Sequence, residues 1–526
     1  MYKSSSAFLF LLPATLYLTL FPAINGANIF VILPTFSPSH LIFETSVAKT
    51  MAERGHNVTV VSLLPLREEW LHPSMTYIQM GSVKGNSDLC ISATRGFGIR
   101  RFLNALDLMD TLKRAMAEML EHPKMQELLH NRDNKFDLIL YGYMYIDFVY
   151  GLAEHFDCPV ALLWANMPVA PLMQIIGNPM EMSYTPLGVM NSIPWDYNLG
   201  LLFRVKNIFS IAAEYFMLLL NHWSIEGIYR KHFGQYASMS KAKERVSMVL
   251  FSHHFSEKPV PLVPAMIEVG GIHLNEQPDP LPKDIENFIT DAEEGVILFT
   301  LGTNVKEDHL HPKTLDKIYN VLSKLPQKVL WKCDDEYRIP GNSSNILFRS
   351  WLPQRDILAH PKVKLLFGHG GKGGITEAKF YGVPIVGMPL FADQFLNMNE
   401  VVVNGYGLML EHGEALNDVI IYATVNEVLE NKTYSRNVKQ FSKLYRDRPL
   451  SIKDNAVYWL EYLIRYKGAL HMQSPLKTMS FVEANNLDLY LLLSIALYLL
   501  WRSIKFFAKG VVDLETHISN FKIKMD

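Results

Sequence analysis

The residues best suited to chemistry gather in one stretch of the chain, from Trp351 to Gln394. At its centre the run His369–Gly374 (HGGKGG) directly follows the short apolar segment Val363–Gly368. Glycines let a backbone approach a ligand closely, and the free N–H groups at the start of a helix attract a phosphate. The run therefore predicts a binding site for a diphosphate.

The segments around this run indicate how it is positioned. Val363–Gly368 is typical of a buried parallel strand, Ile375–Tyr381 of a short helix, and Pro384–Met388 of a second buried strand. This β-loop-α-β order places the glycine-rich loop at the carboxyl end of a strand. The glycine spacing matches neither the Rossmann G-x-G-x-x-G nor the P-loop pattern, so the glycines alone do not identify the ligand.

The stretch as a whole resembles the donor-binding signature of the UDP-glycosyltransferases, the family of the animal UDP-glucuronosyltransferases and insect UDP-glucosyltransferases. The resemblance assigns each part of a UDP-sugar to residues of this chain: uracil and ribose to Trp351, Leu352 and Gln354, the diphosphate to His369, Gly371, Gly373 and Gly374, the ribose hydroxyls to Glu377, and the sugar to Asp393 and Gln394. These roles suit the side chains, because an aromatic face stacks on a base and a carboxylate accepts from two vicinal hydroxyls. The alternative is an ordinary β-α-β unit with a polar rim.

A second loop resembles the same family, and two positions depart from it. Gly302 and Thr303 follow an expected strand over Val296–Thr300 and resemble the family's glycine-serine loop, which touches the phosphate. The family usually has Ser or Thr at the position of Gly368, and many members have Asn or Ser at that of Gly373. Each glycine removes side-chain hydrogen bonds worth about 1 kcal/mol, whereas the backbone N–H groups remain.

His40 is the candidate general base. It lies in the loop PTFSPSH after an expected first strand over Ala27–Leu33, and an expected helix over Leu41–Arg54 follows it. In the resembled family the histidine after the first strand is the general base, and an imidazole with a pKa of about 6.5 can take a proton from a phenol or alcohol. The alternative is a structural loop histidine.

The acid that orients this histidine in the family is missing from its usual place. The family has Asp or Glu after the strand expected within Phe136–Tyr145, and the matching position here is Gly142. Asp147 is the nearest carboxylate. Either Asp147 replaces the missing acid as a catalytic residue beside His40, or the pair is incomplete, and loss of such a carboxylate lowers a rate by orders of magnitude.

The acceptor side and the domain boundaries are less sharply marked. Asn166–Trp223 is rich in Met, Pro and aromatic residues, which is typical of an apolar acceptor pocket or, alternatively, of core and lid packing.

The expected organisation is a signal peptide over 1–26, an N-terminal acceptor-binding domain over 27–258, a proline-rich linker over 259–283, a UDP-sugar-binding domain with return helices over 284–470, a transmembrane helix over 485–508 and a cytosolic tail over 509–526. The resemblance implies the α/β GT-B fold, two Rossmann-like doubly wound domains facing a cleft.

Both ends of the chain predict membrane targeting. Met1–Gly26 has an apolar run typical of a cleavable signal peptide, with an N-terminal anchor as the alternative. Leu487–Trp501 is strongly apolar and is followed by Arg502 and Lys505, which predicts a single transmembrane helix with a cytosolic tail; the alternative is a core helix. The last residues, Lys522–Asp526, resemble the dilysine signal of endoplasmic-reticulum membrane proteins. A lumenal body would allow glycosylation at the sequons of Asn57, Asn342 and Asn431.

Composition excludes several classes of protein. The 50 Lys and Arg residues nearly balance the 52 Asp and Glu residues, so no nucleic-acid binding is implied. The 3 cysteines make no disulfide framework and their spacing suits no zinc site. The chain has no Asp-x-Asp or HExxH motif, so we expect no metal and no cofactor, with the UDP-sugar as co-substrate.

Together these features predict a membrane-anchored, inverting UDP-glycosyltransferase of the endoplasmic reticulum. It would move glucose or glucuronic acid to a hydroxyl of a small lipophilic acceptor, in detoxification or hormone conjugation. The main alternative is a non-catalytic relative that binds a UDP-sugar or a lipophilic ligand, or partners an active transferase as a homo- or hetero-oligomer. A nucleotide-dependent dehydrogenase is disfavoured by the missing G-x-G-x-x-G.

Overall fold

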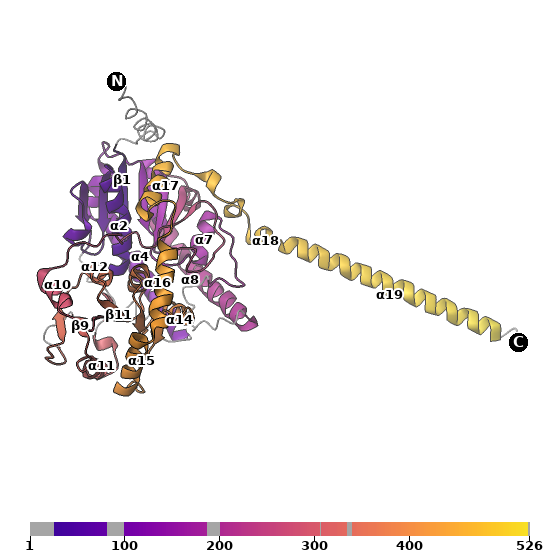
Figure 1. Ribbon diagram of the computed structural model, residues 1–526. Helices are drawn as coiled ribbons and strands as arrows, with labels where there is room; N and C mark the ends of the chain where they lie inside the picture. The colour runs from indigo at the N-terminus through magenta and orange to yellow at the C-terminus, as the bar shows by residue number, and fades with distance from the viewer. Residues whose placement is uncertain (1–25, 82–98, 187–199, 306, 334–338, 524–526) are drawn as a thin grey trace, which may run out of the picture. The chain divides into compact units, whose positions relative to one another are not determined.

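The computed structural model describes residues 26–81, 99–186, 200–305, 307–333 and 339–523 (Figure 1). The expected signal peptide, apart from Gly26, and the end of the expected retrieval signal lie outside these residues. The described chain forms two compact units, one ending at Gln473 and the other beginning at Ser474.

The first half of the larger unit is built on a parallel sheet. Its seven strands lie in the order β3-β2-β1-β4-β5-β6-β7. Their bounds are β1 Asn28–Leu33, β2 Asn57–Ser62, β3 Met75–Gln79, β4 Leu138–Gly142, β5 Val160–Trp164, β6 Val246–Phe251 and β7 Met266–Glu268. The helices are α2 Pro38–Glu53, α4 Ile99–Glu121, α5 Pro123–His130, α6 Gly151–Phe156, α7 Ala170–Ile176, α8 Leu201–Phe233 and α9 Met239–Lys243.

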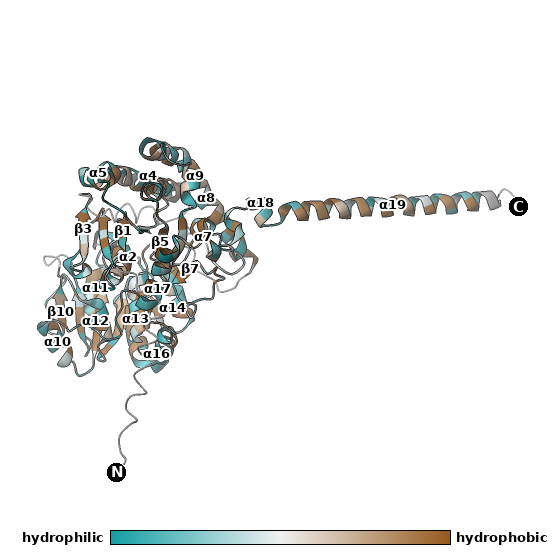
Figure 2. Ribbon diagram, turned by 90° about the horizontal axis from the view of Figure 1, so that it is seen from above, coloured by the Kyte–Doolittle hydropathy of each residue, from teal (hydrophilic) through white to brown (hydrophobic). Residues whose placement is uncertain are grey.

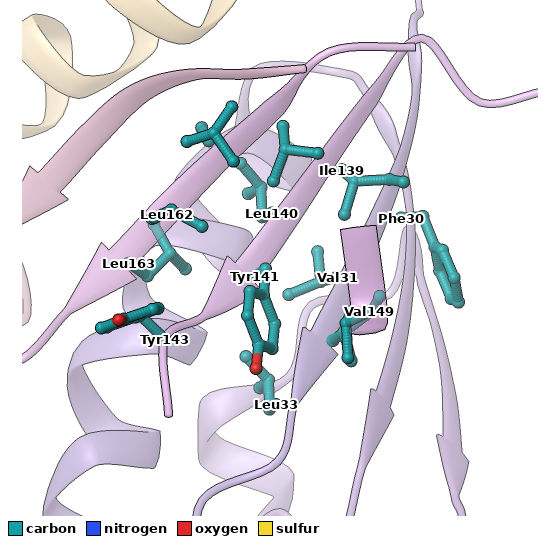
Figure 3. Packing of buried hydrophobic residues seen from close by; sticks show 14 of the residues in the cluster. Phe30, Val31, Leu33, Ile139, Leu140, Tyr141, Tyr143, Val149, Leu162 and Leu163 are labelled. Atoms are coloured by element: carbon teal, nitrogen blue, oxygen red, sulfur yellow. The ribbon is translucent and has the colours of Figure 1, made fainter. Parts of the chain in front are cut away.

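The core of this half lies on the central strands. β1 and β4 are buried along almost their whole length, as continuous apolar segments of a doubly covered parallel sheet are. Val31 pairs in register with Val60 on one side and with Leu140 on the other. Figure 3 shows side chains of β1, β4 and β5, among them Val31, Tyr141 and Leu162, meeting in this core.

The second half repeats the architecture. Its six parallel strands lie in the order β10-β9-β8-β11-β12-β13, with bounds β8 Val296–Thr300, β9 Lys328–Lys332, β10 Ile346–Arg349, β11 Val363–Gly368, β12 Ile385–Gly387 and β13 Gly407–Met409. The helices are α10 Lys283–Thr290, α11 Thr314–Leu322, α12 Gln354–Ala359, α13 Lys372–Tyr381, α14 Gln394–Val403, α15 Asp418–Glu430, α16 Lys432–Arg446 and α17 Ile452–Tyr466. The predicted GT-B architecture of two Rossmann-like domains is confirmed.

The helix α17 returns to the first half. Its buried side chains Ala456, Val457, Leu460 and Leu463 belong to the hydrophobic core of the first sheet. An ion pair between Arg54 and Asp454 adds a polar contact between α2 and α17. The return of the last helices, which the resemblance implied, is therefore present.

Two helices near the site begin earlier than the sequence predicted. α2 begins at Pro38 and α13 at Lys372, three residues before the expected starts in each case. Proline is favoured in the first turn of a helix because its missing N–H would have no partner there. The prediction that His40 lies on a loop is therefore wrong, since the residue lies in the first turn of α2.

The second unit consists mainly of the helix α19, Leu487–Ile523, preceded by the short helix α18, Phe481–Ala484. Within Leu487–Ile518 the most apolar stretch of 18 residues has a mean hydropathy of 1.6, and none of its residues is buried. Figure 2 shows hydrophobic residues along much of this helix. α8 is the other described helix that is long and apolar enough to cross a membrane, with a mean hydropathy of 1.2. α19 is long enough for a bilayer core, which takes about 20 residues.

Candidate active site

One cavity of about 630 Å³ is lined by both halves of the larger unit. This volume is in the range of small-ligand sites, about 300–1,000 Å³. Among its lining residues are all but one of the residues expected to act on a substrate: His40, Gly302, Thr303, Trp351, Leu352, Gln354, His369, Gly371, Gly373, Gly374, Glu377, Asp393 and Gln394. The exception is Asp147.

The glycine-rich loop holds His369 closely. A Cβ at Gly302 would lie 2.4 Å from Cε1 of His369, and a Cβ at Gly371 would lie 2.4 Å from its Nε2. The imidazole therefore lies against two backbones that only glycine lets come so near. Gly371 directly precedes the first residue of α13. The loop that contains His369 is therefore followed at once by the free N–H groups at the start of a helix.

Burial lowers the pKa of His369 to about 4, although a hydrogen bond with the backbone of Thr300 favours the charged form. The ring is therefore neutral near pH 7. A diphosphate beside it would favour the charged form. His369 is consequently able to gain a proton when an anionic ligand binds.

Glu377 is held by two side chains of the same cavity. It accepts a hydrogen bond from Nε2 of Gln354, and its Oε1 lies 3.3 Å from Nε2 of His273. With 8% of its surface exposed, this carboxylate has a fixed position, as a ribose-binding acceptor requires. His273 was missed by the sequence analysis because it lies in the proline-rich linker, far from the donor signature.

Asp393 and Gln394 are also fixed by neighbours. Oδ2 of Asp393 accepts from Nδ2 of Asn397 at 2.8 Å, and burial raises the pKa of this carboxyl group. Oε1 of Gln394 accepts from the backbone N–H groups of Leu390 and Phe391 at 2.8 and 3.2 Å. The amide group of Gln394 is left as its donor to a sugar hydroxyl.

Trp351 carries a contact that the sequence did not predict. The guanidinium of Arg67, from the first half, lies 3.4 Å from the centre of the indole ring. An arginine over an aromatic face is a favourable cation-π contact. One face of the indole ring is therefore covered by Arg67.

Lys372, in the glycine-rich run, is tied to the first half of the chain. Its Nζ donates to both carboxylate oxygens of Glu257, at 3.0 and 2.9 Å. Oε1 of Glu257 also accepts from Lys379 at 2.6 Å, and Lys379 donates to Glu400 at 2.7 Å. Glu257 and Lys379 are almost fully buried, at 2% and 1% side-chain exposure, so the start of α13 is held by a buried charge network.

His40 faces the cavity from α2. Its ring packs edge-on against Trp164, with 6.2 Å between ring centres. Burial lowers the pKa of His40 to about 4, so the imidazole is neutral and able to accept a proton. Its Nδ1 is buried and has no hydrogen-bond partner among the residues that the structure describes.

Asp147 does not join this group. It begins a short 3-10 helix, Asp147–Tyr150, and its Oδ2 accepts from Nζ of Lys243 at 2.7 Å. It is absent from the cavity lining. The structure therefore gives Asp147 a lysine partner rather than bringing it beside His40.

The wall around His40 is apolar and comes from two regions. Trp164, Met167 and Met217 lie in or beside the region that the sequence assigned to the acceptor pocket. Leu108 and Met109 come from α4, which lies outside the region that the sequence assigned to the acceptor pocket. An apolar molecule with a hydroxyl group would fit between this wall and His40.

Comparison with known proteins identifies the family. A family model described as "UDP-glucoronosyl and UDP-glucosyl transferase" matches residues 76–517. UDP-glucosyltransferase 2 of Dactylopius coccus is 33% identical over 524 residues, which cover 93% of each chain. UDP-glucuronosyltransferase 1A1 of Mus musculus is 27% identical, over 92% of this chain and 91% of the mouse protein.

A solved structure supports the fold independently. Os79 from O. sativa in complex with UDP aligns with a TM-score of 0.55 at 15% identity, over 82% of this chain and 99% of that chain. The chain belongs to the UDP-glucuronosyl and UDP-glucosyl transferase family.

Proposed function

We propose that the protein transfers a hexose from a UDP-sugar to a hydroxyl group of a small lipophilic acceptor. The observation that carries this proposal is a single cavity in which the donor signature, His40 and an apolar wall meet. A transferase needs both substrates within one enclosed space, because the reacting atoms must come within about 3–3.5 Å of each other. A protein that only binds a nucleotide sugar would not require a histidine such as His40 beside the apolar wall of the cavity.

The reaction would be a single displacement. His40 takes the proton of the acceptor hydroxyl, the acceptor oxygen bonds to the anomeric carbon, and the bond from that carbon to UDP breaks. Because the acceptor attacks from the side opposite UDP, the configuration of the sugar is inverted. The leaving UDP would gain its charge beside His369, Thr303 and the backbone N–H groups of Gly371 and Gly373, which act as an anion site.

The other donor residues would orient the sugar nucleotide. Glu377 would accept from the ribose hydroxyls, and Asp393 with Gln394 would bind the sugar. Trp351, Leu352 and Gln354 would lie against uracil and ribose. The donor sugar is proposed to be glucose or glucuronic acid, and the acceptor a phenol, flavonoid or steroid, as a detoxifying or hormone-conjugating enzyme would use.

We place the protein in the endoplasmic-reticulum membrane as a single-pass type I protein with a lumenal body. The length and apolar character of α19 support an anchor, and the basic residues Arg502 and Lys505 support a cytosolic end. Asn342 and Asn431 are exposed, as glycosylation in the lumen would require. Homo- or hetero-oligomers are compatible with this arrangement.

One observation favours a second candidate function. Gly142 supplies no carboxylate to His40, and Asp147 pairs with Lys243. A non-catalytic relative that binds a UDP-sugar, or a lipophilic ligand, or partners an active transferase would not need the acid.

The test is UDP release by membranes that carry the full chain. UDP-glucose and UDP-glucuronic acid would serve as donors, with a panel of phenols, flavonoids and steroids as acceptors. His40→Ala should lower turnover by about 10²–10⁴-fold and leave UDP-sugar binding intact. His130→Ala, at an exposed histidine outside the cavity, is the matched control. Absence of turnover with every pair, together with UDP-sugar binding that His369→Ala abolishes, would favour the second candidate.

A further inference from the structure

Two buried polar groups of the first half are left without partners one helical turn apart. Nδ1 of His40 and Oε2 of Glu44 are both buried, and neither has a hydrogen-bond partner within the described parts of the chain. Both residues belong to α2, where side chains four positions apart lie on the same face. Glu44 is 1% exposed, and a buried carboxyl group without a partner is costly. The proximity of two such groups indicates that they act on each other.

Gly142 makes the space that Glu44 occupies. A Cβ at Gly142 would lie 2.7 Å from Cδ and from Oε1 of Glu44, and 2.8 Å from Oε2. Real Cβ atoms essentially never come within 3.0 Å of another heavy atom, so any side chain at position 142 would displace this carboxyl group. The carboxyl group of Glu44 therefore lies at the carboxyl end of β4, where the side chain of residue 142 would begin.

We infer that Glu44 is the positioning residue of His40 and supplies from α2 the carboxyl group that a glycine at the end of β4 cannot supply. This inference deepens the proposed function. A turn of the Glu44 side chain brings an oxygen to Nδ1 of His40, which then donates its hydrogen to the carboxylate. Nε2 keeps its lone pair for the acceptor proton. When His40 takes that proton, the carboxylate stabilises the imidazolium, and no further co-reactant is needed.

The other groups around this pair do not replace Glu44. Trp164 packs in a T-shaped contact with the His40 ring, and its indole N–H donates to the carbonyl of Met167 at 2.6 Å. Tyr141, the neighbour of Gly142, donates its hydroxyl hydrogen to the carbonyl of Ile146 at 3.1 Å. The nearest acid in sequence, Asp147, accepts from Lys243. Each of these groups already has a partner other than Nδ1 of His40.

Burial acts on both members of the pair in the same sense. It raises the pKa of Glu44 and lowers the pKa of His40, so burial disfavours the charged form of each group. The productive form holds one proton, on Nδ1 of His40, and arises when the pair loses or shares the carboxyl proton. Turnover should therefore rise with pH through this step, and the rise should depend on Glu44.

The main variant is Glu44→Gln, which keeps the shape of the side chain and removes its ionisation. We expect kcat to fall by about 10²–10⁴-fold, as the loss of an orienting acid does elsewhere. The KM for the UDP-sugar and the affinity for UDP should stay within about threefold, because Glu44 touches neither. Glu53→Gln, an exposed position on the same helix, is the matched control and should behave as the unaltered chain.

A swap separates positioning from a structural role. Glu44→Ala should lose turnover, and Gly142→Asp alone should be defective because its new side chain meets Glu44. The double variant Glu44→Ala with Gly142→Asp should recover at least about tenfold in kcat over Glu44→Ala, since the acid returns from the strand. Full activity in Glu44→Gln would overturn the inference. So would a loss of turnover in Asp147→Asn combined with an unchanged pH profile in Glu44→Gln.

A second readout does not need turnover. The rate at which diethyl pyrocarbonate modifies His40, measured by peptide mass spectrometry from pH 3 to 8, reports the pKa of the ring in the full chain. Glu44→Gln should lower this pKa by about 1 unit, because an anionic partner favours the imidazolium. An unchanged pKa would overturn the inference even in a chain that shows no transfer. A pKa shift without turnover would instead refute the proposed reaction and leave the pairing standing.

Discussion

The close fit of His369 against the glycines of the donor loop gives a test of the diphosphate site. In Gly371→Ala the new Cβ would lie 2.4 Å from Nε2 of His369, whereas ordinary contacts begin at 3.4 Å. The ring must therefore move by about 1 Å. The backbone of Gly371, with φ of −67°, suits alanine, so the substitution acts through the ring and not through backbone strain.

A displacement of this size would remove the hydrogen bond that we propose between His369 and the diphosphate. A hydrogen bond to a charged group is worth about 1.5–3 kcal/mol, which corresponds to about 10–150-fold in affinity. Titration calorimetry with UDP-glucose would measure the loss, and a thermal melt would show whether the fold is intact. We expect the melting temperature to change little, because the ring faces the cavity.

Gly373→Ala provides the control for the same loop. No atom lies within 4 Å of a Cβ at this position, which lies in the first turn of α13. Because Gly373 offers its backbone N–H and alanine keeps it, affinity should stay within about threefold, with a small gain in helix stability of about 0.5–1 kcal/mol. Equal losses in the two variants would refute the argument that His369 is held by Gly371.

Three further perturbations test other parts of the molecule. UDP-glucose affinity should fall as pH rises above about 4, the pKa of His369 before a ligand binds, since a bound diphosphate would raise this pKa and the complex would hold an extra proton. Calorimetry in buffers of different ionisation enthalpy would detect this proton uptake, and uptake that persists in His369→Ala would contradict the assignment. Lys379→Met should lower the free energy of unfolding by about 3–5 kcal/mol, because Glu257 and Glu400 lose a buried cation. Urea denaturation would measure this change, and a loss below about 1 kcal/mol would contradict the stabilising role of the buried charge network. A chain ending at Gln473 should be found in the soluble fraction and not in the membrane pellet, with an unchanged melting temperature. If this chain still sediments with the membranes, the apolar face of α8 would be the anchor instead of α19.

The donor side of the site was largely predictable from the sequence. β11, the glycine-rich loop and α13 are consecutive in the chain, so a local pattern of apolar and glycine residues was enough to order them. The predicted start of α2 is three residues too late, because the expected loop PTFSPSH includes Pro38, although proline is favoured in a first helical turn. The resemblance nevertheless singled out His40 in that segment, and His40 lines the cavity.

The remaining features depend on contacts between distant segments. Three contacts join residues that are not linked by any periodic spacing in the sequence. They are the stacking of Arg67 on Trp351, the contact of His273 with Glu377 and the approach of Glu44 to Gly142. The expectation for Asp147 followed nearness in sequence, whereas the fold turns its carboxylate to Lys243. Spacing along one strand or helix predicts which residues share a face, but it does not predict which faces meet.

The return of α17 to the first sheet reverses the usual order of folding during synthesis. Domains generally fold as units while the ribosome is still at work, the N-terminal one first. Here Val457, Leu460 and Leu463 complete the core around β1 and β4, yet they leave the ribosome after the whole second domain. The domain made first is therefore completed last. Until then it presents to chaperones an apolar surface that α17 will cover, and a nonsense mutation before Ile452 would leave that surface exposed in every copy.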